Sequence, residues 1–174
     1  MPAAGPRAIL ARMYATFDSH TTDQPAEVFV LRRLGDGRTS ALALRATTTD
    51  PAAYLVDDDL AGPAAGQPAS AATVIWFDGP ISPARREAGR FGFRERIAPA
   101  MTGTPGHIRT FVLWRERDAA CCVVVLATDL DTLEAVGRAV NATRLLPDED
   151  KALLTGPDRF EVHHVREGVA SPTS

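Results

Sequence analysis

Two side chains capable of acid–base chemistry, His107 and Arg109, open the strand-like segment 107–117. A histidine there could take a phenolic proton near neutral pH, and an arginine could hold the resulting oxyanion or a carboxylate. The pair predicts an oxygenase that lets a substrate carbanion reduce oxygen directly. The alternative interpretation is an exposed loop histidine beside a surface arginine.

A third candidate is His163, which lies with His164 in the strand-like run "RFEVHHV". Adjacent residues of a strand point to opposite faces, so one of the two can face a pocket and act as an acid or base. Two histidines on opposite faces do not form a metal site, and no metal is predicted. The consecutive carboxylates Asp57–Asp59 cannot all converge on a cation and predict a solvated loop.

Trp114 and Trp76 are candidates for substrate binding, since an indole can stack on a flat aromatic molecule and donate one hydrogen bond. The alternative for each is a tryptophan of the core or of an interface. Cys121 and Cys122 are adjacent and flanked by apolar residues, which favours packing over nucleophilic catalysis.

The composition is that of a globular chain: 174 residues, 45% hydrophobic, with a formal net charge of -3 and a pI near 5.8. It predicts one domain, or two small ones sharing a core, and argues against nucleic acid or an anionic membrane as partner. Adjacent cysteines, the lack of a long apolar run and the lack of a signal sequence predict a cytoplasmic protein. Motifs for nucleotide hydrolysis, Rossmann-type redox chemistry and serine hydrolysis are missing.

An internal repeat indicates which elements position these residues. "FVLRRLGDGRTSALALRATTTD" begins at Phe29, and the similar "FVLWRERDAACCVVVLATD" begins at Phe111, 82 positions later (111 − 29). Each segment predicts two antiparallel strands joined by a tight turn.

The second half predicts strand, helix, two strands, helix and strand, the ferredoxin-like order. Its helices are expected at 82–101, with a Ser cap and Pro in the first turn, and at 129–146. The first half predicts three strands and, at 47–60, a short helix at most. The expected boundaries are an extension at 1–12, a degenerate first repeat at 13–61, a linker at 62–72, a complete repeat at 73–167 and a tail at 168–174.

The predicted strands are apolar on both faces, so helices covering one face leave the other in need of a partner. Two such sheets can pack face to face, within a chain or between chains, and leave a pocket between sheets and helices. The expected fold is therefore α+β, a ferredoxin-like tandem repeat whose antiparallel sheets pack as an α+β barrel, with a helix-poor first repeat.

The order of elements from 74 to 165, the segment "FVLW…VVVLATDLDTLEA" and the final "RFEVHHV" resemble the dimeric α+β barrel superfamily, and within it the antibiotic-biosynthesis monooxygenase group. The resemblance implies cofactor-independent oxygenases and cyclases of aromatic polyketides. It also implies pocket positions at Val125 and, in the first repeat, Tyr54. The haem-ligating histidine of haem-degrading members has no counterpart here.

These observations predict a small-molecule enzyme of antibiotic or other secondary metabolism, a monooxygenase or cyclase acting on an aromatic polyketide-type intermediate. Its catalytic candidates are His107, Arg109 and His163. No bound cofactor is predicted, with molecular oxygen as co-substrate and reduced flavin as an open alternative. A homodimer is the expected assembly. The alternative is a non-catalytic barrel that binds a ligand or a partner.

Overall fold

The computed structural model describes residues 12–18 and 24–168, with side chains up to Arg166. The strands are β1 (Tyr14–Phe17), β2 (Glu27–Arg33), β3 (Thr39–Arg45), β4 (Tyr54–Ala61), β5 (Ala71–Phe77), β6 (His107–Arg115), β7 (Ala120–Ala127) and β8 (Arg159–Gly168). The helical segments are α1 (Pro83–Gly92), the π-helical turn η1 (Phe93–Ile97), α2 (Ala98–Thr102), the 3-10 turn η2 (Glu116–Asp118) and α3 (Leu130–Asn141).

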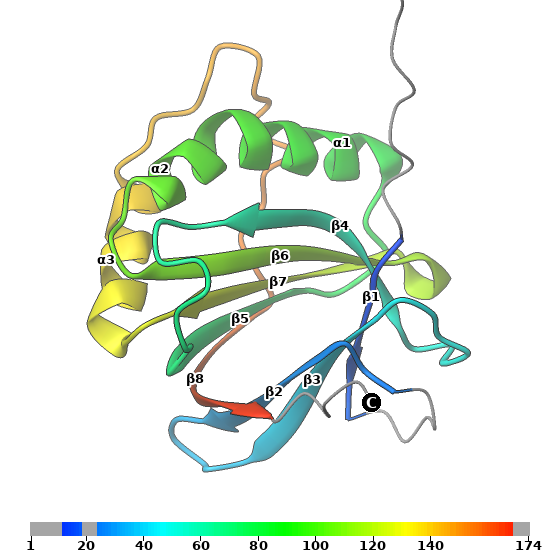
Figure 1. The fold of residues 1–174 in the computed structure, drawn as a ribbon. Coiled ribbons are helices and arrows are strands. Elements are labelled where there is room, and N and C mark those ends of the chain that lie inside the picture. Colours follow the sequence, from blue (N-terminus) through cyan, green and yellow to red (C-terminus); the bar gives the residue numbers. More distant parts are fainter. Residues whose placement is uncertain (1–11, 19–23, 169–174) are drawn as a thin grey trace, which may run out of the picture.

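The eight strands form a closed antiparallel barrel in the order β1-β3-β2-β8-β5-β7-β6-β4 (Figure 1). In the second half β5, α1–α2, β6, β7, α3 and β8 follow one another, which confirms the predicted ferredoxin-like order. Numbered within its own half, each set of four strands is arranged 4-1-3-2. The descent of both halves from one repeated unit stays a prediction. Because β2 pairs with β8 and β4 with β6, the barrel closes within one chain.

The expectation of a short helix at 47–60 is wrong, because this segment is a turn followed by β4. The carboxylate of Asp50 accepts a hydrogen bond from the backbone N–H of Ala52 at 2.8 Å, so the capping signal closes a turn and starts no helix. Tyr54 and Val56 then point into the barrel core, with the alternation of a strand. In the described part of the first half, 12–18 and 24–61, there is no helix, so this half is poorer in helices than predicted.

The three consecutive aspartates of β4 do not lie in a solvated loop. A register shift between Val56 and Asp58 marks a bulge, and each carboxylate pairs with arginine. The ion pairs are Asp57–Arg86 at 3.3 Å, Asp57–Arg90 at 3.7 Å, Asp58–Arg94 at 3.0 Å and Asp59–Arg109 at 2.7 Å. Three of these arginines come from α1 and η1, so β4 holds the helical layer through charge pairs.

The segment between the halves is packed against the barrel. The N–H of Gly62 donates to the carbonyl of Ile108 at 2.8 Å, and Ala64 and Ala69 are buried in the core. A Cβ on Gly62 would come within 2.1 Å of the carbonyl oxygen of His107, so this close approach requires glycine. β5 begins at Ala71, two residues before the predicted boundary.

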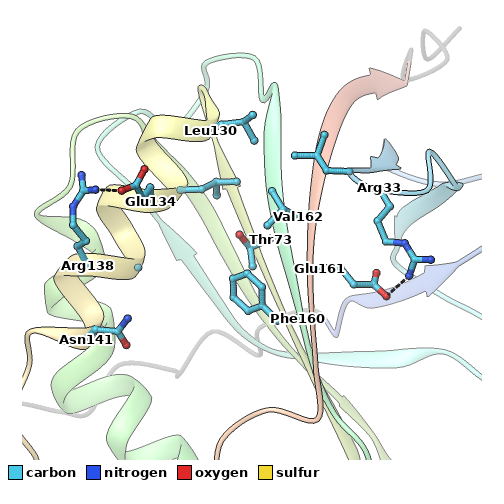
Figure 2. Close-up of a pocket in the computed structure, with 13 residues that line it drawn as sticks. Arg33, Thr73, Leu130, Glu134, Arg138, Asn141, Phe160, Glu161 and Val162 are labelled. Carbon is cyan, nitrogen blue, oxygen red and sulfur yellow. Dashed lines mark hydrogen bonds and ion pairs between the residues drawn. The ribbon is translucent and has the colours of Figure 1, made fainter.

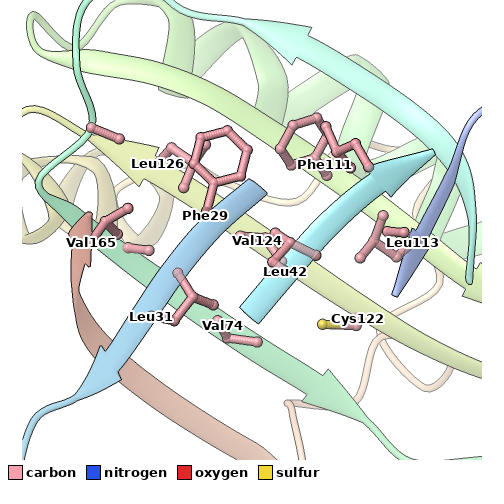
Figure 3. Close-up of a cluster of buried hydrophobic side chains, with 14 of the residues drawn as sticks. Phe29, Leu31, Leu42, Val74, Phe111, Leu113, Cys122, Val124, Leu126 and Val165 are labelled. Atoms are coloured by element: carbon pink, nitrogen blue, oxygen red, sulfur yellow. The ribbon is translucent and has the colours of Figure 1, made fainter. Parts of the chain in front are cut away.

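Side chains from all eight strands fill the barrel interior, as Figure 3 shows for its centre. The largest fully buried ones include Phe111, Leu31, Leu42, Leu44, Leu113 and Leu126. The barrel interior is therefore filled by side chains, as in other small barrels. A ligand has to bind at its outer surface or its ends.

The helices lie on one side of the barrel, over the outer faces of strands from the second half (Figure 1). Phe93, Met101, Leu133 and Val136 from the helical segments pack on Val125 and neighbouring strand residues. α1 begins at the Ser82 cap, whose hydroxyl accepts from the N–H of Arg85 at 3.2 Å. None of the helices in the described residues is long and apolar enough to cross a membrane.

Candidate functional site

An open groove of about 890 Å³ lies on the outside of the barrel, between α3, the strands β5 and β8, and the end of the β2–β3 hairpin (Figure 2). Pockets that bind drug-sized ligands have volumes of roughly 300–1,000 Å³, and the groove falls within this range. It is the candidate functional site.

The helix α3 forms one wall of the groove. Asp129 caps the helix, since its carboxylate accepts from the N–H of Thr132 at 2.7 Å, and hydrogen bonds from Thr132 and Thr128 lower the pKa of Asp129. Leu133 and Val136 anchor the helix on the sheet. The face toward the groove carries Leu130, Leu133, Glu134, Gly137, Arg138 and Asn141.

The floor consists of the outward-facing residues Thr73 of β5 and Phe160 and Val162 of β8. Thr73 is 6% exposed, whereas Phe160 is 62% exposed. Figure 2 shows the Phe160 ring beside Thr73 and Val162. A large aromatic ring left open to solvent at the floor of a groove is suited to stacking on a flat ligand.

The other wall is the end of the β2–β3 hairpin, with Arg33, Leu34 and Gly35, together with Glu161 of β8. The Nη1 of Arg33 donates to Oε1 of Glu161 at 2.9 Å, and Asp36 holds the rest of the guanidinium. These ion pairs raise the pKa of Arg33, chiefly through Asp36. Leu34 is 40% exposed and extends the apolar surface.

The structure does not bring His107 and Arg109 together. The His107 ring is fully buried, with Nε2 at 2.8 Å from the hydroxyl of Thr110, and burial lowers its pKa. It therefore does not lie in an exposed loop or at an open barrel mouth. Arg109 donates to Asp59 at 2.7 Å and to Glu27 at 2.9 Å, and these partners raise its pKa.

His163 lies behind the groove. Its side chain is 4% exposed, and its Nε2 is 3.2 Å from Oε2 of Glu161, which lines the groove. Burial lowers the pKa of His163, while Glu161 acts in the opposite direction. His163 thus lies on the opposite side of β8 from Phe160 and Val162 of the groove floor.

Two predicted substrate-binding residues, Trp76 and Tyr54, meet at one end of the barrel. With Phe17 they form an aromatic cluster, in which the Phe17 and Trp76 ring centroids are 5.0 Å apart. The guanidinium groups of Arg115 and Arg159 lie over Tyr54 and Trp76 at 4.6 and 4.8 Å. Burial raises the pKa of Tyr54 to about 12.

The other two, Trp114 and Val125, lie under the helices. The Arg86 guanidinium is 4.0 Å from the Trp114 ring centroid, and the indole N–H donates to Glu116 at 2.7 Å. Val125 pairs with Thr73 of the groove floor but is 4% exposed beneath α3. Neither side chain belongs to the groove lining.

Several residues of the groove lining were not among the predicted site residues: Phe160, Thr73, Arg33, Glu161 and the polar face of α3. Alternation along "RFEVHHV" places Phe160 on the opposite face of the strand from Glu161 and His163. It does not show which of the two faces is exposed to solvent, because that depends on the position of α3. Among residues 12–18 and 24–168, no three His, Cys, Asp or Glu side chains converge as metal ligands would.

No model of a known family matches the sequence, and no curated protein matches it either. Among solved structures, the chain is similar to an uncharacterised ferredoxin-fold protein of Listeria monocytogenes related to antibiotic biosynthesis monooxygenases. That match has a TM-score of 0.60 and 8% identity, and covers 90% of this chain and 95% of the other.

Two further structures have the same arrangement. A major regulator of staphylococcal pathogenesis matches with a TM-score of 0.56 and 11% identity, over 88% of this chain and 97% of its own. A haem-degrading enzyme of Listeria monocytogenes matches with a TM-score of 0.53 and 10% identity, over 88% and 98%. The chain therefore has the ferredoxin-type α+β fold of proteins related to the antibiotic biosynthesis monooxygenases.

Proposed function

We propose that this protein binds a flat aromatic small molecule in the groove between α3 and β8 and acts on it as a monooxygenase or cyclase of secondary metabolism. The observation that carries the proposal is the groove itself, with its open volume of about 890 Å³ and the exposed Phe160 ring at its floor. The similarity in fold to proteins related to monooxygenases and to a haem-degrading enzyme supports it.

The lining matches an aromatic polyketide-type ligand in chemistry. Phe160 supplies a stacking surface, and Leu130, Leu133 and Val162 supply apolar contacts. Thr73 and Asn141 supply a hydroxyl and an amide for the oxygen substituents of such a molecule. Apolar walls with a few polar groups are the usual composition of small-molecule sites.

The chemistry in this scheme begins with removal of a proton from the bound substrate. The resulting carbanion reduces molecular oxygen, as in a monooxygenase that binds no cofactor, or attacks a carbonyl, as in a cyclase. Reduced flavin supplied by a partner is the alternative source of electrons for the oxygenase.

A non-catalytic binding protein is the second candidate, and one observation favours it. The side chains of His107, Cys121, Cys122 and Tyr54, which are the usual bases and nucleophiles, lie outside the groove lining. One structure of the same fold is described as a regulator.

The two candidates are separated by measuring binding and turnover with the same hydroxylated anthrones. Equilibrium dialysis gives the dissociation constant, while an oxygen electrode and product analysis give turnover. The proposed function predicts binding together with oxygen uptake or a cyclised product. Binding without any product supports the second candidate, and no binding overturns both.

A further inference from the structure

The floor of the groove contains one hydroxyl in a row of apolar side chains. In the sheet, Thr73 of β5 pairs with Val125 of β7 on one side and with Val162 of β8 on the other. All three side chains are β-branched and point to the outer face of the sheet, which α3 partly covers. Because valine has nearly the shape of threonine, packing alone does not account for a hydroxyl at this position.

The Thr73 hydroxyl has no partner in the protein. Thr73 is 6% exposed, and its side chain makes no hydrogen bond to any of the residues 12–18 and 24–168. Its oxygen is nevertheless not sealed off, because Thr73 lines the groove. Buried polar groups are nearly always hydrogen-bonded. The partner of this hydroxyl therefore has to come from the groove, as solvent or as part of a ligand.

An aromatic surface lies next to Thr73. Phe160 is on the same face of β8 as Val162, two residues before it, so its ring is a diagonal neighbour of the Thr73 side chain. Diagonal neighbours in an antiparallel pair are roughly 7–8 Å apart, a span that a fused aromatic ring system covers. Figure 2 shows the exposed Phe160 ring beside Thr73. A flat ligand stacked on Phe160 therefore brings its edge to the Thr73 hydroxyl.

We propose that Thr73 is the specificity residue of the groove and donates a hydrogen bond to the carbonyl oxygen of a ligand stacked on Phe160. The inference rests on the proposed function and narrows its substrate class to flat aromatic ketones and quinones with the carbonyl at the edge of the ring system. The neighbouring side chains of Val125 and Val162 offer no acceptor for the hydroxyl hydrogen, so the ligand has to supply one.

The selection against ligands without an oxygen follows from desolvation. A ring that stacks on Phe160 removes solvent from the Thr73 hydroxyl. A ligand carbonyl replaces the lost hydrogen bond, whereas a ligand with only C–H groups at its edge leaves the hydroxyl without a partner. A site that bonds a polar group of its ligand rejects the analogue lacking that group for this reason.

The test compares 9-fluorenone with fluorene, two rigid, flat molecules that differ only in a carbonyl against a CH2 group. Equilibrium dialysis gives both dissociation constants, with the ligand kept below its solubility and the protein concentration varied. In Thr73→Val, the ratio of the fluorene to the 9-fluorenone dissociation constant should fall by about threefold to tenfold, the range of one net hydrogen bond. Thr73→Ser, which keeps a hydroxyl, should retain most of the parent ratio.

Two further variants locate the effect. Thr39→Val makes the same change at an exposed residue of β3, away from the groove lining, and should leave the ratio unchanged. Phe160→Ala should weaken the binding of both molecules by a similar factor, since it removes the stacking surface and keeps the hydroxyl. Because the Thr73 hydroxyl has no partner in the protein, Thr73→Val should melt at no lower temperature than the parent.

An unchanged ratio in Thr73→Val would overturn the inference. A Thr73→Val protein that melts at a lower temperature would overturn it as well, because the hydroxyl would then have a partner inside the protein. In either case the proposed groove stands if Phe160→Ala weakens the binding of both molecules. If the parent binds neither molecule, the proposed groove falls together with this inference.

Discussion

At the scale of single residues, the structure does not form the acid–base pair that the sequence predicted. A base next to an oxyanion-holding arginine was expected at His107 and Arg109, but the guanidinium of Arg109 is bound by Asp59 and Glu27. His107 instead fills a buried position at the start of β6, where its ring bonds Thr110. Residue type alone does not distinguish an accessible base from a buried side chain, because the difference depends on which face of a strand is exposed to solvent.

The buried position of His107 predicts how stability depends on pH. Burial lowers the pKa of His107, so the unfolded chain binds its proton at a higher pH than the folded one. The contribution of His107 is then complete above the ordinary histidine pKa of about 6.5 and is lost as pH falls below it. The free energy of unfolding should decrease from pH 7.5 to pH 5.

Urea titrations across this range measure the effect. His163 acts in the same direction, since burial also lowers its pKa. His107→Gln should therefore flatten the dependence without abolishing it. A slope as steep as that of the parent would show that His107 is not held neutral.

At the scale of elements, the sequence predicted most of the second half and mispredicted one element of the first. The Ser82 cap, the apolar stripe of α3 and the two hairpins follow from local patterns, and all are present. β4 was missed because the Thr-Asp-Pro signal before it suits a turn as well as a helix start. The groove could not be predicted, because it depends on where α3 ends relative to the uncovered part of β8.

One contact between elements should be essential to the long connection from α3 to β8. The side chain of Glu149 is 1% exposed, and its Oε2 accepts from the Arg96 Nε at 2.8 Å and from the N–H of Leu146 at 2.7 Å. The Arg96 guanidinium holds the pKa of Glu149 below its usual value. Glu149→Ala should lower the free energy of unfolding by about 3 kcal/mol, because a buried cation loses its partner.

Urea denaturation measures this loss, with Glu134→Ala as the control. Glu134 pairs with Arg138 on the exposed surface of α3, and losing such a pair should cost less than about 0.5 kcal/mol. Equal effects of the two substitutions would contradict the account of the connection.

At the scale of the whole molecule, one chain supplies every strand of the barrel. The sheet packing was expected to be completed either within the chain or by a second copy, and the β2–β8 and β4–β6 pairs complete it within the chain. The apolar faces that called for a second sheet are buried in the shared core of the two halves. The predicted homodimer stays a prediction, and the barrel core does not depend on it.

Internal closure predicts the behaviour on dilution. The midpoint of urea unfolding should not change over a hundredfold range of protein concentration, since an obligate dimer alone links folding to concentration by mass action. Sedimentation velocity at the same concentrations reports the assembly state. A midpoint that rises with concentration would show that a second copy contributes to the fold.

The central claim is that ligands bind in the groove beside α3, and two glycines allow a matched test. Gly137 lines the groove and Gly89 lies on α1, and a Cβ at either position meets nothing within 4 Å. Gly137→Phe should place an aromatic ring in the groove, while Gly89→Phe makes the same change away from it. Both replace a helical glycine, so neither should destabilise its helix.

The most direct measurement is the dissociation constant of a hydroxylated anthrone for the parent and these two variants. We expect binding at least about tenfold weaker in Gly137→Phe, a loss of about 1.4 kcal/mol, and unchanged in Gly89→Phe. Unchanged binding in Gly137→Phe would contradict the account and place the ligand elsewhere on the barrel.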